Sequence, residues 1–336
     1  GNNKNFNHLK VHTQYSICEG AIKIDDLADF CKSNKIKAIG LSDSYNLCGA
    51  LEFADKISKV GTQPIIGTQI NINLDNIYGK ISLYATSEAG YKSLTKLSSI
   101  SYLKNDGSTE PTCNLEDLKQ NSEDLVLLTG NSKNFFGKLF FKNKLKDFEQ
   151  ILNSLKNSFK NRLYIEIQRH NEPQEKNFEN YLLNISKPLQ LPLIATQEIF
   201  YLNENMYEAH DALVCIGEKN FVDDKNRFRY SNQHYLKSQE ELEKLYSDIP
   251  EALENNYNFH LRFNFKPKKS KPILPSIANK ESSSPEEELS NLAKKGLENR
   301  LANFILKKDK IKSKDKILEI YEDRLNHEIN IINSMD

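Results

Sequence analysis

The chain has 336 residues, of which 38% are hydrophobic and 27% charged, with 46 Lys and Arg against 46 Asp and Glu. The zero net charge excludes a strongly basic nucleic-acid-binding protein, so any basic surface must be local. Five scattered cysteines without a C-x-x-C pair indicate reduced thiols in a cytoplasmic protein, and no apolar run reaches the roughly 18 residues that a membrane span needs.

The first predicted strand covers residues 8–12, where apolar and polar side chains alternate. His8, Lys10 and His12 share one face of this strand, and the apolar residues between them share the other. Two histidines around a central position are a common start for a metal site on a barrel. Here the central position is Lys10, whose ammonium group cannot bind a metal while it is charged.

Helices and short apolar strands then alternate along the chain. Helical spacing predicts helices at 22–34, 49–60, 88–101, 144–159 and 174–187. Strands are expected at 38–41, 64–66, 70–74, 80–85, 125–129, 163–168 and 193–196, with a turn near Tyr78–Gly79. Such alternation favours a closed βα barrel, whose chemistry lies at the C-terminal ends of its strands. The polar residues at those ends are His12, Asp43, Gln69, Asn131, Glu166, His170 and Glu198.

The sequence changes character beyond residue 262. Residues 262–271 contain five basic residues and no acid, and prolines punctuate this stretch, which is typical of an extended linker. Ser284-Pro285-Glu286-Glu287 has the cap, the proline and the capping-box glutamate of a helix start. We therefore expect a domain at 2–262, a linker at 263–283 and a helical segment at 284–336 that leads into a further domain.

Three stretches, 8–20, 38–53 and 64–67, closely resemble the PHP (polymerase and histidinol phosphatase) family. They resemble the form found at the N-terminus of the alpha subunits of bacterial replicative DNA polymerase III, and residues 297–335 resemble the segment that leads into the polymerase palm. The resemblance implies an α/β fold: a distorted (βα)7 TIM-like barrel followed by a helical tail. It also implies a parent nucleotidyltransferase, a DNA-directed DNA polymerase with Mg²⁺ in its palm, and no catalytic residue in this part.

Active PHP domains build a trinuclear metal cluster from His, Asp, Glu and Cys ligands. The resemblance places the corresponding positions here at Lys10, His12, Glu19, Asp43, Ser44, Gln69, Lys80, Asn131, Glu198 and Phe200. Only four of them could still bind a metal, so we expect no metal in this site. At most one Zn²⁺ or Mn²⁺ ion would bind, at His12, Asp43 and Glu198. Alternatively, Lys10 and Lys80 could pair with Asp43 and Glu198 and replace metal charge with side-chain charge.

The resemblance implies a structural role and a docking surface for the proofreading exonuclease subunit. Other replicase subunits, and DNA through the full-length polymerase, would be further partners. The alternative is a metal-dependent phosphoesterase or 3′–5′ exonuclease with a residual metal site, and a stand-alone barrel binding a small phosphate ester is a third reading. The phenylalanines at 135, 136, 140 and 141 are expected in the core, with a partner-binding patch as the alternative. The basic residues at 262–271 could contact DNA or form a solvated hinge.

Overall fold

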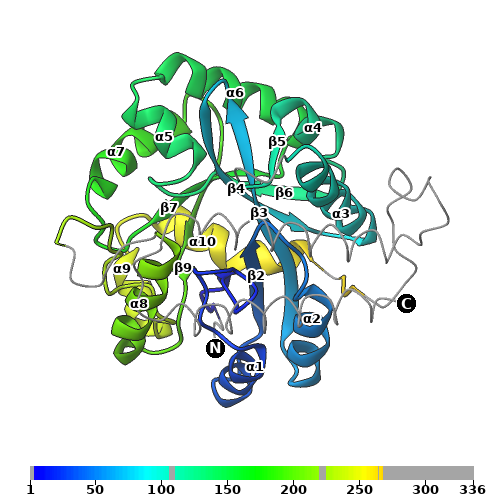
Figure 1. Ribbon diagram of the computed structural model, residues 1–336, viewed down its shortest axis with the longest axis vertical. Coiled ribbons are helices and arrows are strands. Elements are labelled where there is room, and N and C mark those ends of the chain that lie inside the picture. The colour runs from blue at the N-terminus through cyan, green and yellow to red at the C-terminus, as the bar shows by residue number, and fades with distance from the viewer. Residues whose placement is uncertain (1–3, 106–109, 219–224, 264, 268–336) are drawn as a thin grey trace.

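The computed structural model describes residues 4–105, 110–218, 225–263 and 265–267, and Figure 1 shows these residues as one rounded α/β unit. The predicted helical segment at 284–336 and most of the predicted linker lie outside these residues. None of the helices in the described ranges is long and apolar enough to cross a membrane.

A barrel of hydrogen-bonded strands forms the centre of the molecule. The strands are β1 (His8–Val11), β2 (Ala38–Ser44), β3 (Gln63–Leu74), β4 (Ile77–Ala85), β5 (Thr112–Asn114), β6 (Leu125–Leu128), β7 (Leu163–Gln168), β8 (Leu193–Thr196) and β9 (Glu198–Ile199). Their order is β8-β7-β6-β4-β3-β2-β1-β9, with β5 added to β3. Gln197 alone separates β8 from β9. This segment therefore pairs with β7 on one side and with β1 on the other, which closes the sheet.

One strand breaks the parallel arrangement. β4 runs antiparallel to both of its neighbours, β3 and β6, whereas the other strand pairs are parallel. The predicted turn near Tyr78–Gly79 is wrong, because both residues lie inside β4. The hairpin turns three residues before Tyr78, at Asp75, which has a positive φ of 52°. Gly79 instead allows a close approach, since a Cβ there would lie 2.4 Å from the Phe135 backbone.

Ten α-helices in the described part of the chain surround the barrel (Figure 1). They are α1 (Ile24–Ser33), α2 (Ala50–Lys59), α3 (Glu88–Leu103), α4 (Leu115–Gln120), α5 (Phe135–Phe141), α6 (Leu145–Phe159), α7 (Glu175–Ser186), α8 (Tyr207–Gly217), α9 (Gln239–Leu245) and α10 (Pro250–Phe259). Two short 3-10 helices, Glu204–Met206 and His260–Arg262, complete the set. The five helices predicted from their spacing are confirmed within a few residues, because each buries a regular apolar face.

Helix α10 connects the N-terminal segment of the barrel domain to β8 through hydrogen bonds. The fully buried side chain of Asn256 accepts a hydrogen bond from the Asn7 backbone N–H at 2.7 Å and donates to the Asn7 and Ala195 carbonyls. Packing against the barrel also continues past the predicted boundary at residue 262. Phe263 is buried against Phe259, and Phe265 contacts the Tyr91 ring.

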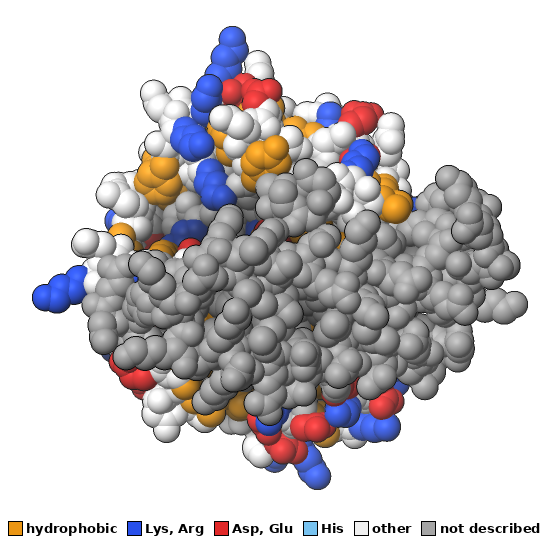
Figure 2. All heavy atoms as spheres, viewed as in Figure 1, with side chains coloured by type: hydrophobic (Ala, Val, Ile, Leu, Met, Phe, Trp, Pro, Cys, Tyr) orange, Lys and Arg blue, Asp and Glu red, His pale blue; other side chains and the backbone are white. Residues whose placement is uncertain are grey.

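The aromatic cluster of α5 lies mostly in the core, as expected. Phe135 and Phe136 are fully buried, and Phe140 packs on Tyr181 of α7, whereas Phe141 is 44% exposed. On the face drawn in Figure 2, basic and acidic side chains occur together at the upper and lower edges, in keeping with the zero net charge.

Candidate functional site

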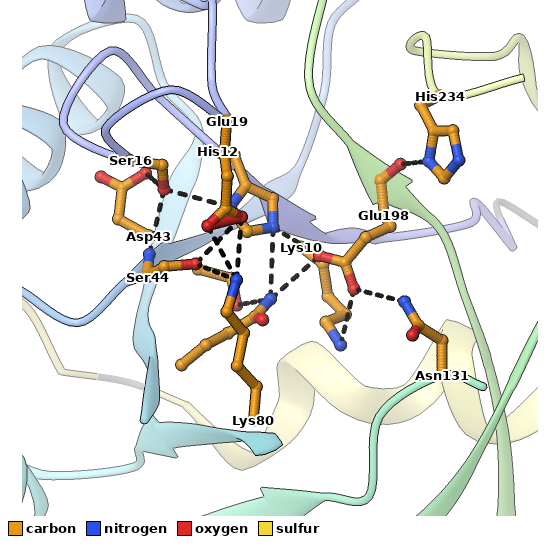
Figure 3. Close-up of polar contacts among 12 residues, drawn as sticks. Lys10, His12, Ser16, Glu19, Asp43, Ser44, Lys80, Asn131, Glu198 and His234 are labelled. Carbon is orange, nitrogen blue, oxygen red and sulfur yellow. Dashed lines mark hydrogen bonds and ion pairs between the residues drawn. The ribbon is translucent and has the colours of Figure 1, made fainter. Parts of the chain in front are cut away.

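The side chain of Lys10 lies at the centre of the site, at the C-terminal end of β1 (Figure 3). Its ammonium nitrogen is 3.0 Å from Glu198 Oε1 and 3.1 Å from Glu166 Oε2, and neither Lys10 nor Glu166 has any exposed side-chain surface. Burial disfavours the charge on Lys10, but the two carboxylates outweigh it, so the pKa of Lys10 is raised. One ammonium thus links strands β1, β7 and β9 across the barrel.

Glu198 has polar partners at both of its carboxylate oxygens. Oε1 accepts from Lys10 and, at 3.1 Å, from the Gln168 amide; Oε2 is in contact with His12 Nε2 and accepts from the Gln69 amide at 2.9 Å. Burial alone would raise the pKa of Glu198, yet Lys10 and His12 hold it well below its usual value. The predicted pairing of Lys10 with Glu198 is confirmed.

Asp43 faces a different set of donors. It accepts 2.6 Å hydrogen bonds from the backbone N–H and the hydroxyl of Thr13 and a 2.9 Å bond from the Ser16 hydroxyl. Burial raises the pKa of Asp43 in spite of these donors. Asp43 reaches His12 only through Ser16, whose oxygen lies 3.0 Å from His12 Nδ1. Ser16 therefore links Asp43 to His12 indirectly. Among the described residues, Asp43 forms no direct bond to Glu198.

A second ion pair closes the mouth of the site. Lys80, on β4, lies 2.7 Å from Glu19 Oε1 and donates to the Ser44 hydroxyl at 2.9 Å. Burial opposes both charges, but their mutual attraction outweighs it: the pKa of Lys80 is raised and that of Glu19 is lowered. The predicted pairing of one of the two ammonium groups with Asp43 is wrong, because Thr13 and Ser16 already bind the Asp43 oxygens.

The remaining predicted positions lie around these two ion pairs. The Asn131 amide donates to Gln168 at 3.2 Å and reaches Glu198 at 3.5 Å. Phe200 is apolar and packs between two imidazoles, with ring centroids 4.7 Å from His12 and 5.1 Å from His210. Burial lowers the pKa of His210 to about 4, so this histidine is neutral at pH 7.

Two further histidines form hydrogen bonds with the backbone of Glu198. The Glu198 backbone N–H donates to His170 Nε2 at 3.0 Å, and its carbonyl oxygen lies 2.8 Å from His234 Nδ1. The two imidazoles stack with centroids 4.0 Å apart, and burial is the main cause that lowers the pKa of each. His170 was expected at a strand end, whereas nothing around His234 in the sequence relates it to this site.

Sequence reasoning missed the role of Glu166. It was counted among the polar strand-end residues but not as the partner of Lys10. Besides Lys10, it accepts from the Gly130 N–H at 2.8 Å and from the Thr196 hydroxyl at 2.7 Å. The available signal was a charged residue between two apolar ones, Ile165 and Ile167, in the strand Leu163–Gln168.

The arrangement is a closed network in which side-chain cations balance the carboxylates. No three His, Cys, Asp or Glu side chains within the described ranges are grouped so that they could hold a metal ion. The site is thus a cluster of ion pairs and hydrogen bonds between side chains of the described residues. Neither ammonium has a lone pair with which to attack a substrate.

Comparison with known proteins identifies the barrel. Residues 8–170 match the PHP domain family. These residues are therefore similar to a PHP domain. The match ends within the site, at His170, so the PHP domain region supplies Lys10 and Glu166 while Glu198 comes from later in the chain.

The chain is also similar to the DNA polymerase III alpha subunits of two bacteria over 98% of its length, with 35% identity to each. These are the subunits of Caulobacter vibrioides and Rickettsia bellii, of which it covers 29% and 28%. It thus spans less than a third of these curated relatives and corresponds to an N-terminal part. Among solved structures, an amidohydrolase from Chromobacterium violaceum is similar at 10% identity with a TM-score of 0.42, over 62% of this chain and 96% of that chain.

Proposed function

We propose that this chain is the PHP-containing N-terminal region of a bacterial replicative DNA polymerase III alpha subunit, acting in the cytoplasm in DNA replication. Its PHP site is degenerate and its role is structural. The observation that supports a degenerate site is the position of the buried Lys10 ammonium between Glu166 and Glu198. A divalent cation placed between these carboxylates would meet a fixed positive charge at contact distance, and like charges in a buried site repel strongly. The residues present do not fit a metal cluster.

The same reasoning applies to the mouth of the site. Lys80 neutralises Glu19, and the amides of Gln69 and Asn131 stand at positions where the family resemblance implies ligands. A side-chain amide is a weaker ligand for a divalent metal than a carboxylate or an imidazole. A single residual ion at His12, Asp43 and Glu198 remains the alternative, and with it a metal-dependent phosphoesterase or 3′–5′ exonuclease.

The proposed division of the chain has a barrel at 2–262, a linker at 263–283 and a helical segment at 284–336 that enters the palm. Polymerisation, with Mg²⁺ as cofactor, would then belong to the palm and not to this region. The catalytically silent barrel would serve as a docking surface for the proofreading exonuclease subunit and contact other replicase subunits. DNA would be held by the complete polymerase.

Metal content tests the degenerate site directly. The purified chain is equilibrated with Zn²⁺ and Mn²⁺, desalted and analysed by elemental mass spectrometry. We expect well under one equivalent of either metal. Two or three tightly held equivalents would overturn the proposal and make the phosphoesterase function the leading one. One equivalent that is lost on substitution of His12 would favour the single-ion alternative.

The docking role needs a separate measurement. The chain and the proofreading exonuclease subunit of the same bacterium are mixed at micromolar concentration and analysed by size-exclusion chromatography with light scattering. Co-elution as a stoichiometric complex is expected. Separate elution of the two proteins at this concentration would contradict the docking role without bearing on the metal site.

A further inference from the structure

A polar groove lies at the end of the barrel opposite the ion-pair site. It is open to solvent, has a volume of about 1050 Å³ and lies where β7 and β8 begin, whereas the site lies where they end. Its lining comes from the end of α6, the loop before β8, α10 and the 3-10 helix after it. The lining residues are Asn153, Lys156, Asn157, Lys160, Asn161, Tyr164, Gln190, Pro192, Asn255 and Arg262.

The groove has a single sign of charge. Lys156, Lys160 and Arg262 line it, and none of the groove-lining residues is an acid. In the part of the chain that the structure describes, none of these three cations forms an ion pair. Lys156 donates to the Leu189 carbonyl at 2.9 Å and Arg262 to the Asn161 carbonyl at 2.8 Å, which positions them without cancelling their charge. Three uncompensated cations in a concave surface attract an anion.

The backbone at Lys160 is strained. Lys160 has φ 55° and ψ −119°, and the Arg162 N–H donates to the Phe159 carbonyl at 2.9 Å. These values describe the second residue of a type II′ turn, a position that favours glycine because a Cβ is unfavourable there. A lysine at this position costs conformational energy, and such strain is concentrated at sites of function. The strained turn presents a cationic side chain to the groove.

The uncharged part of the lining suits a nucleotide chain. Five side-chain amides provide donors and acceptors for sugars and base edges. The Arg262 guanidinium lies over the Tyr164 ring at 5.3 Å, and Tyr164 is almost fully buried, so this pair forms the floor. A flexible single strand can reach such a floor with its bases, whereas a duplex presents mainly its outer phosphates to a protein groove.

We propose that this groove binds single-stranded nucleic acid through its phosphates and without sequence preference. Lys156 and Lys160 contact the phosphates, and the amides and the Arg262–Tyr164 pair contact sugars and bases. The inference rests on the groove alone. The metal content of the opposite end of the barrel can be high or low without affecting it.

Fluorescence anisotropy with a labelled oligothymidylate of about 20 nucleotides tests the proposal, since single-strand binding modules occupy about 4–16 nucleotides. The groove variant is Lys156→Gln/Lys160→Gln. Its control is Lys32→Gln/Lys37→Gln, which removes two exposed lysines on and near α1 that form no ion pair within the described ranges. We expect the groove variant to bind about tenfold more weakly, with a salt slope lower by about 1.4 for two lost phosphate contacts. The control should bind as the unmodified chain does.

Lys160→Gly separates binding from folding. Glycine relieves the strained turn, so the melting temperature should stay equal or rise while affinity for the oligonucleotide falls. Lys35→Gly is the matched control, because Lys35 also has a positive φ, of 51°, and lies outside the groove. It should leave binding unchanged. Absence of binding by the unmodified chain, equal weakening in groove and control variants, or equal groove-dependent binding of a duplex of the same length would each overturn the proposal.

Discussion

The Lys10 ammonium lies 3.0 Å from Glu198 Oε1 in a part of the barrel where Lys10 has no exposed surface. The two residues are paired in register across adjacent parallel strands, β1 and β9, so the backbone itself brings the charges together. Glu166 adds a second carboxylate from β7. A buried charge is tolerated only when it is paired and hydrogen-bonded, and this pair satisfies both conditions.

Removal of the Lys10 charge should strongly destabilise the fold. Lys10→Met keeps the approximate volume but leaves two buried carboxylates without their cation, and breaking a buried pair in this way costs about 3–5 kcal/mol. Urea unfolding would measure the loss. Lys59→Met is the control, because Lys59 pairs with Asp55 on the surface, with exposures of 71% and 54%, and should change the free energy of unfolding by less than about 1 kcal/mol. Equal effects of the two substitutions would show that Lys10 is not the counterion of the core.

Restoration of a histidine at the central position should not restore hydrolysis. Lys10→His removes one cation, but Lys80, Gln69, Asn131 and Phe200 still stand at positions that the PHP resemblance assigns to ligands. We expect no hydrolysis of a chromogenic phosphate ester above background with Zn²⁺ or Mn²⁺. A clear gain of metal-dependent hydrolysis in this single variant would show that the other positions matter less than their chemistry indicates.

Stability should fall as the pH drops from 6.5 to 4. Burial, with Lys237 adding to it, lowers the pKa of His8 to about 4, and burial does the same for His210. An unfolded histidine titrates near pH 6.5, so in this window the unfolded state binds more protons than the folded state. Each histidine therefore contributes stability that is fully present above pH 6.5 and is lost as the pH falls through about 4.

Substitution of His8 isolates its share of this effect. His8→Leu should flatten the dependence of unfolding free energy on pH by up to about 1.4 kcal/mol per pH unit inside the window. Urea titrations at half-unit intervals from pH 7 to 4 would measure both slopes. Identical slopes for the variant and the unmodified chain would mean that His8 gains a proton in the folded state as readily as in the unfolded state.

Gly40→Ala should destabilise the barrel at the junction of β1 and β2. A Cβ at Gly40 would lie 2.5 Å from the Leu9 carbonyl oxygen and 2.8 Å from the Leu9 Cα, and backbone atoms cannot move aside as a flexible side chain can. We expect a loss of about 1–3 kcal/mol in thermal or urea unfolding, the usual cost of overpacking. Gly61→Asn serves as the control, because Gly61 has open space around it and asparagine tolerates its positive φ. A neutral Gly40→Ala would mean that β1 can shift away from β2.

Local pattern was sufficient for most of the regular elements. The helices α1, α2, α3, α6 and α7 and the strands β2, β7 and β8 follow from apolar spacing, because each buries one face or a continuous run in the core. The short elements β5, α4 and β9 did not follow, since two to six residues carry too little periodicity. Their positions depend on strands that are distant in sequence.

The sequence by itself determined which residue types stand at the strand ends, and hence that cations and amides take positions where the PHP resemblance implies ligands. Only the tertiary structure decided which charges meet. Lys80 pairs with Glu19 and not with Asp43. Lys10 pairs with Glu166, and the spacing of these residues in the sequence does not predict that contact. The reason is geometric: pairing across a barrel depends on strand register and on the side chains that already occupy each carboxylate, and neither is encoded in a local pattern.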